Sequence, residues 1–338
     1  MLEQYKGELA ALLAAFLWAA ASTVFSRLGQ KVPPLELNLL KGVVAIAFLI
    51  VTLAIQGEWL PELNWVAIGF LLTSGIFGIG IGDTAFFWAI NLLGARRTLL
   101  LKTLTSPLVA LLALIFLQET LTPTDWCGIL LTLLGIAWVI SERVSATTDT
   151  TNHFLQGIGW AIVATFGDAT GAILSRAALT QSNIIPMWST LLRLSAGVLV
   201  LLLWLLVKRP GETNNLSPTF TPLDRREGSP STKFTPLGKG GRGGSSSTKF
   251  TPLGKGGRGG SPKLLGIIAI TAFFSTYLGI FLQQISLKFT AAGIAQTLGA
   301  TSPLFVLPFA IWTGDKVSLR AFLGVLIALA GVWLLFRV

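Results

Sequence analysis

Charged side chains inside apolar segments are the residues of this sequence best suited to chemistry. Asp83 ends the glycine-rich run that starts at Gly78, and Lys102 lies in the next apolar segment. Asp168 and Arg193 are opposite charges in two later apolar segments. Because an unpaired charge is expensive in lipid, we predict the pairs Asp83–Lys102 and Asp168–Arg193. The first pair could respond to a proton or a substrate in a central cavity, or it could be a fixed ion pair near one membrane surface.

Polar side chains also recur at helical spacing in the apolar segments. Thr98, Lys102 and Ser106 share one helix face. Such stripes could line a wet cavity or hydrogen-bond neighbouring helices, and we favour lining because glutamine is costly against lipid. The substrate site is therefore predicted to comprise Trp18, Ser22, Asp83, Thr98, Lys102, Ser106, Ser275, Tyr277, Gln283 and Gln296.

A second set of residues is expected to have structural or gating roles. Pro107 and Pro303 lie inside apolar segments at matched places, and each should kink its helix, with or without motion. Lys41 and Arg193 follow Pro34 and Pro186 at the same distance, which favours a packing role for both and for Asp168.

The composition excludes several classes of protein. Hydrophobic residues make up 52% of the 338 residues and charged residues only 12%, against roughly 25% in a soluble domain. The apolar surface must therefore face lipid. With one histidine (His153) and one cysteine (Cys127), we predict no disulfide within the chain, no metal site and no cofactor. No catalytic set of side chains converges, so we predict no enzymatic activity.

Ten segments are apolar and long enough to cross a bilayer as helices, which takes about 20 residues each. We expect the first to be retained as a span rather than removed as a leader, because mixed charge precedes it. The segments lie near 8–28, 35–55, 65–88, 97–117, 125–141, 157–179, 185–207, 264–286, 291–312 and 319–337.

The chain repeats itself once. Leu104-Thr-Ser-Pro-Leu-Val recurs as Ala300-Thr-Ser-Pro-Leu-Phe, 196 residues later, and Phe25-Ser-Arg recurs as Leu174-Ser-Arg. Each copy, 1–143 and 153–338, contains five segments, and an odd number places the second copy upside down. We therefore predict an all-α polytopic membrane protein of ten transmembrane helices in two inverted five-helix repeats.

Most of the positive charge belongs to one interruption of the second repeat. The segment 208–263 carries eleven Lys/Arg and three Asp/Glu, a net +8 of the total +10. Its repeated Gly, Ser, Pro and Lys predict a disordered basic loop, or alternatively a tether to anionic lipid headgroups. Because the rest of the chain is nearly neutral, we predict no nucleic acid partner.

The two copies resemble the EamA domains of the drug/metabolite transporter superfamily. The resemblance rests on a Ser-Pro in the fourth span, an acidic residue at its end and two glycines seven apart in the fifth, plus an arginine early in the second span. These positions are Ser106, Pro107, Glu119, Gly128 and Gly135, then Ser302, Pro303, Asp315, Gly324 and Gly331, with Arg193 and, in the first copy, Lys41. The resemblance implies a ten-helix carrier for amino acids, sugars, nucleotide derivatives or drugs in the cell (inner) membrane.

We accordingly predict a carrier that moves a small polar or amphiphilic metabolite by alternating access, with proton-coupled export or facilitated exchange as the modes. Its expected partners are the solute and the lipid bilayer, with a homodimer as a further option. A channel-like or structural membrane protein is the alternative. The orientation stays open, because the distribution of Lys and Arg places the termini outside whereas the resemblance places them in the cytoplasm.

Overall fold

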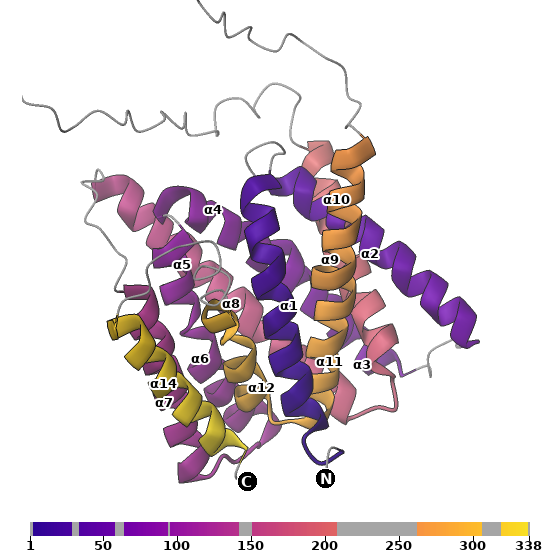
Figure 1. The fold of residues 1–338 in the computed structure, drawn as a ribbon. Helices are drawn as coiled ribbons and strands as arrows, with labels where there is room; N and C mark the ends of the chain where they lie inside the picture. Colours follow the sequence, from indigo (N-terminus) through magenta and orange to yellow (C-terminus); the bar gives the residue numbers. More distant parts are fainter. Residues whose placement is uncertain are drawn as a thin grey trace, which may run out of the picture.

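The computed structural model describes residues 3–28, 34–57, 64–93, 95–141, 151–207, 262–305 and 319–336. Every regular element in these ranges is a helix (Figure 1). The first half contains α1 (Lys6–Leu28), α2 (Pro34–Gln56), α3 (Trp65–Gly75), η1 (Ile76–Gly82), α4 (Asp83–Leu93), α5 (Ala95–Lys102), α6 (Thr105–Leu112), η2 (Ala113–Leu117) and α7 (Pro123–Ser141). The second half contains α8 (Thr151–Thr180), α9 (Pro186–Val207), α10 (Pro262–Ala272), η4 (Phe273–Leu278), α11 (Gly279–Phe289), α12 (Ala292–Gly299) and α14 (Leu319–Leu335).

The helices are apolar enough to cross a membrane, as the sequence predicts. Seven continuous helical stretches satisfy both length and hydropathy among the described residues: 35–56, 65–90, 97–117, 123–140, 154–180, 186–207 and 264–289. Large apolar side chains cover the outside, such as Ile55 and Val207, each 82% exposed. Only lipid accommodates such a surface, so the prediction of an all-α polytopic membrane protein is confirmed. The end of the ninth predicted span and residues 208–261 lie outside the described residues, whereas the last two residues of the predicted 208–263 loop already belong to α10, which begins at Pro262.

Matched irregularities interrupt the two halves. A π-helical stretch, η1 in the first half and η4 in the second, lies in the third span of each. The fourth spans break between α5 and α6 and again after α12, in each case about one turn before a proline, Pro107 or Pro303. A proline cannot donate to the carbonyl four residues earlier, which accounts for the position of both breaks. π-helical turns are frequent at functional sites, so the third spans are of particular interest.

The halves pack against each other in a reciprocal pattern. α4 packs on α8, and its counterpart α11 packs on α1, which is the counterpart of α8. Likewise η1 contacts α8 and α9, whereas η4 contacts α1 and α2. The fifth spans, α7 and α14, pack directly on each other. This pattern is the one that a two-fold relation between the halves produces.

Glycines allow α7 and α14 to approach closely. A β-carbon on Gly135 would lie 2.6 Å from the carbonyl oxygen of Gly324, and one on Gly331 would lie 2.8 Å from that of Gly128. Small residues at a membrane helix interface let the backbones touch in this way. In the sequence repeat Gly135 corresponds to Gly331 and Gly324 corresponds to Gly128. The two close contacts are therefore equivalent, and the interface between α7 and α14 is symmetric.

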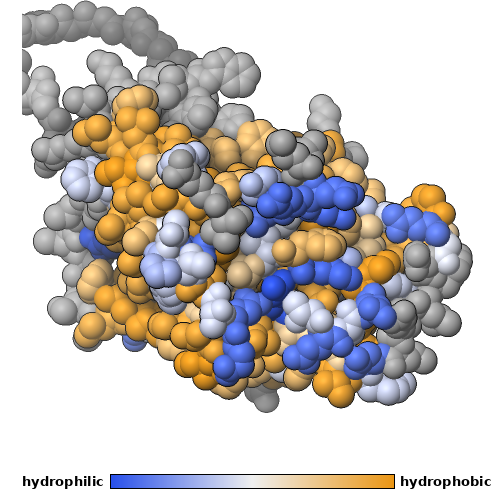
Figure 2. All heavy atoms as spheres, turned by 90° about the horizontal axis from the view of Figure 1, so that it is seen from below, coloured by the Kyte–Doolittle hydropathy of each residue, from blue (hydrophilic) through white to orange (hydrophobic). Residues whose placement is uncertain are grey.

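The chain termini identify one face of the molecule. Both termini lie on one face, which we call the terminal face, and α9 ends and α10 begins on the opposite side (Figure 1). Viewed onto the terminal face, hydrophilic side chains gather in patches bordered by hydrophobic ones (Figure 2). A polar surface of this kind is expected where a membrane protein meets water.

Candidate functional site

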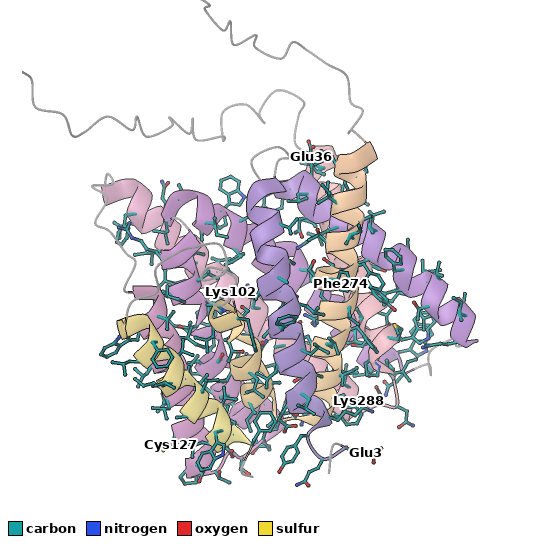
Figure 3. All side chains as sticks on the ribbon, viewed as in Figure 1. Glu3, Glu36, Lys102, Cys127, Phe274 and Lys288 are labelled. Atoms are coloured by element: carbon teal, nitrogen blue, oxygen red, sulfur yellow. The ribbon has the colours of Figure 1, made fainter. Side chains whose placement is uncertain are left out.

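Two ion pairs connect neighbouring helices in the interior of the helix assembly. The Nζ of Lys102 in α5 is 2.8 Å from Oδ2 of Asp168 in α8, and the Nζ of Lys41 in α2 is 4.0 Å from Oδ2 of Asp83 in α4. Figure 3 shows Lys102 inside the helix assembly, between the two faces that carry Glu36 and Glu3. The short ion pairs thus differ from the predicted pairs Asp83–Lys102 and Asp168–Arg193, although Lys102 still interacts with Asp83, and Arg193 with Asp168, through longer-range electrostatics.

The same groups nevertheless form one assembly. Lys102 interacts electrostatically with Asp83 as well as with Asp168, and Arg193 in α9 interacts with both carboxylates. We call Lys41, Asp83, Lys102, Asp168 and Arg193 the charge cluster. Five helices supply it, so its geometry depends on how the halves pack.

The ion-paired side chains remain partly accessible. The side chains of Lys41 and Asp168 are 19% and 17% exposed, and those of Asp83 and Lys102 are each 31% exposed. Aromatic rings of α4 flank both ammonium groups: Lys102 Nζ lies 4.1 Å from the centroid of the Phe86 ring, and Lys41 Nζ lies 5.8 Å from that of Phe87. Cation–π contacts stabilise partly desolvated ammonium groups. These four charged side chains are therefore not fully enclosed by protein, so a solute could reach them.

Arg193 is held by a fully buried hydrogen-bond network. Its side chain is 5% exposed, and Nη1 donates to Oε1 of Gln284 over 2.8 Å. The amide of Gln284 donates in turn to Oγ of Ser189. Gly78 in η1 makes room for the guanidinium, since a β-carbon there would lie 3.3 Å from Nη2. The glycine run that contains Gly78 therefore fits a close approach between η1 and α9.

The sequence analysis missed Gln284. It favoured Gln283, which continues a stripe of polar residues at intervals of four. The π-helical η4 precedes α11 and has hydrogen bonds between residues five apart, so it rotates the following helix relative to an α-helical stripe. As a result Gln284 is fully buried and bonded to Arg193, whereas Gln283 is only half-buried. No pattern in the sequence announces the π-helical turn.

Other predicted substrate residues bind neighbouring helices. The indole Nε1 of Trp18 donates to the carbonyl of Ser275 over 2.9 Å. The hydroxyl of Tyr277 shares a 2.9 Å hydrogen bond with Thr52 in α2. These contacts connect η4 to α1 and α2, so the alternative role of interhelical hydrogen bonding is realised here. For the remaining predicted residues, Thr98 and Ser106 are buried, Gln296 is half-buried, and the side chain of Ser22 lies outside the description.

A second ion pair lies at the terminal face. Nε of Arg176 in α8 lies 2.5 Å from Oε1 of Glu119, and its Nη1 donates to the carbonyls of Leu287 (2.6 Å) and Lys288 (3.0 Å). Oε2 of Glu119 accepts from the backbone N–H of Ala292 over 2.9 Å. Together these groups, which we call the terminal-face cluster, connect α8, the η2–α7 connection and the turn between α11 and α12.

The backbone turn at Gln118 positions Glu119 of the terminal-face cluster. Gln118, in a left-handed conformation (φ 55°), ends η2 and precedes Glu119. Both Glu119 and Arg176 belong to repeated sequence segments, but the repeat alone does not indicate that they meet. Their counterparts in the other half, Asp315 and Arg27, lie outside the described side chains.

We expect Glu119→Gln to lower the free energy of unfolding by about 1.5–3 kcal/mol, because a charge-assisted hydrogen bond of a largely buried arginine is lost. Arg176→Gln should have a similar effect, and the double variant should lose less than the sum, since the two residues share one interaction. Thermal unfolding in detergent measures all three. Glu3→Gln on the same face is the control, and additive losses would show that the two groups are not coupled.

The comparisons with known proteins agree with this architecture. A model of the EamA-like transporter family matches residues 5–141 and again residues 249–337, more than half of the chain. One solved structure, described only as the crystal structure of a protein, aligns with a TM-score of 0.70 over 98% of this chain and 96% of that chain. Its sequence identity is 16%, so the likeness is one of fold. No curated protein matches the chain.

The family model recurs once in each half and includes the glycine-matched fifth spans and the Ser-Pro segments described above. On this evidence the chain is a member of the EamA-like transporter family, a multi-pass membrane transporter of the drug/metabolite superfamily.

Proposed function

We propose that this transporter carries a small polar or amphiphilic metabolite by alternating access and binds it at the charge cluster. One observation carries the proposal: four ionised side chains from both halves stay partly accessible in the interior of a membrane protein. Charged groups in that position are expensive and mark solute pathways. Reciprocal packing of the two halves supports inverted repeats of residues 1–143 and 153–338, between which carriers bind their solutes.

The structure corresponds, in this proposal, to a state closed at the terminal face. The terminal-face cluster ties α8 to the turn between α11 and α12, and the network of Arg193, Gln284 and Ser189 is fully buried. Lys102 and Asp83 are the more exposed members of the charge cluster. Transport would then require the terminal-face cluster to open, with the breaks before Pro107 and Pro303 as the places where the fourth spans bend.

Counterflow in proteoliposomes tests the proposal. Purified protein is reconstituted in vesicles preloaded with candidate metabolites, and the entry of the same labelled metabolite is followed. A carrier gives saturable uptake that the internal solute accelerates. Electrical conductance beyond carrier rates would favour a channel instead, and no solute movement with any metabolite would favour a structural role.

We expect Asp83→Asn to reduce the effect of a pH gradient on uptake. Asp83 interacts with the cations Lys41, Lys102 and Arg193, and 31% of its side chain is exposed, so an incoming solute can reach this acidic group of the charge cluster. The measurement compares uptake with and without a pH gradient across the vesicle membrane. Glu36→Gln, an exposed carboxylate at the first turn of α2, is the matched control. Unchanged pH dependence in Asp83→Asn would remove Asp83 from this role.

We place the protein in the cell (inner) membrane, as the family resemblance implies. A homodimer stays a prediction, which light scattering of the purified protein can test.

A further inference from the structure

We infer that the transported solute is an organic anion and that its negative group binds to the charge cluster as a counter-ion. The inference rests on the proposed function and names its substrate class. It is argued from the charge balance of the cluster, from two unpaired buried groups and from the rings beside the accessible cations.

The charge cluster is not balanced. Lys41, Lys102 and Arg193 supply three positive charges against the two carboxylates of Asp83 and Asp168, so these five described residues together carry a net charge of +1. An unbalanced charge inside a bilayer is unfavourable, and an anionic ligand is the simplest group that removes it. A neutral or cationic solute would leave the excess as it is or increase it.

Two buried polar groups near the cluster have no hydrogen-bond partner. One is Nε–H of Arg193, whose side chain is 5% exposed. The other is the side-chain amide of Asn38, which is 2% exposed and has neither Nδ2 nor Oδ1 paired. Asn38 lies one turn before Lys41 on the same side of α2. Buried donors are nearly always paired in proteins, so these two donors offer hydrogen bonds to the acceptor atoms of a bound group.

The surroundings of the accessible ammonium groups favour an organic ion over a small inorganic one. Lys102 carries one ion-pair partner, Asp168, and is 31% exposed, so its remaining N–H groups can reach a ligand. Phe86 and Phe87 border Lys102 and Lys41 on α4. A carboxylate attached to an apolar body would bind the ammonium group and pack on these rings, whereas chloride would gain only the first contact.

Matched pairs of acids and amides test the inference on the full-length protein. The melting temperature in detergent is measured with benzoate and benzamide, phenylacetate and phenylacetamide, hexanoate and hexanamide, and glutarate and glutaramide. We expect at least one acid to raise the melting temperature by more than 2 °C where its amide does not, because only the charged form compensates the cluster. Equal shifts for acids and amides, or a chloride effect as large as that of the best acid, would overturn the inference.

Variants assign the effect to the charge cluster. Lys102→Gln should raise the concentration of the best acid that is needed for a given rise in melting temperature by about tenfold or more. Lys102→Arg should keep most of the parent's response. Lys6→Gln at the terminal face should not change the response. If Lys102→Gln leaves the response unchanged, the acid binds elsewhere and the inference is wrong.

Counterflow of the same acid separates the two proposals. Acid binding without counterflow of that acid would refute the carrier proposal and leave the anion site standing. Saturable counterflow restricted to neutral or cationic solutes would leave the carrier proposal standing and refute the anion site.

Discussion

Asp168→Asn is expected to lower the free energy of unfolding by about 3 kcal/mol, the lower end of the cost of removing one partner of a buried ion pair, because this pair is only partly buried. Asp168 forms an ion pair with Lys102, in which Oδ2 lies 2.8 Å from Nζ, and it also interacts with Arg193. Without it, three cations of the charge cluster face the single carboxylate of Asp83. Thermal unfolding in detergent measures the stability, and counterflow with the same preparation should show transport lost.

The double variant Lys102→Gln/Asp168→Asn is the decisive control. It removes one charge of each sign and restores the cluster's original net charge, so most of the stability should return. Transport should stay low, because the accessible ammonium group is gone. If Asp168→Asn alone were as stable as the parent, the ion pair would have no structural role. If the double variant were no more stable than Asp168→Asn, the loss would come from something other than unbalanced charge.

Gly135→Ala is expected to be a strongly disruptive single-methyl change. A β-carbon at this position would lie 2.6 Å from the backbone carbonyl of Gly324 and would also meet the backbone of Ala328. Backbone atoms cannot rotate away as a side chain can, so α7 and α14 must separate. Overpacking typically costs about 1–3 kcal/mol, and we expect a value at the upper end here, measured as the shift of thermal unfolding.

Gly159→Ala in α8 provides the matched control. It places the same methyl group in a helix where nothing lies within 4 Å of the new β-carbon. Alanine is the better helix former by about 1 kcal/mol, so this variant should be unchanged or slightly more stable. Equal behaviour of the two variants would contradict the close contact between α7 and α14.

The sequence by itself determined the membrane class, the positions of the seven spans that are long and apolar among the described residues, and the places where the fourth spans break. Hydropathy and proline act on the local chain: an apolar stretch of about 20 residues is helical in lipid whatever its neighbours, and a missing N–H weakens the helix one turn earlier. The glycines Gly128, Gly135, Gly324 and Gly331 could be recognised from their equal spacing in the two copies. That these glycines contact each other could not be predicted in this way.

Only the tertiary structure decided which charges meet and which glutamine is buried. An ion pair depends on which helices are neighbours and how each is rotated, and neither is encoded in the spacing of Asp83, Lys102, Asp168 and Arg193. The contact between Glu119 and Arg176 likewise joins residues 57 apart. Gln284 rather than Gln283 is buried because the π-helical turn of η4, which packs on α1 and α2, changes the rotation of α11 relative to a continuous α-helix.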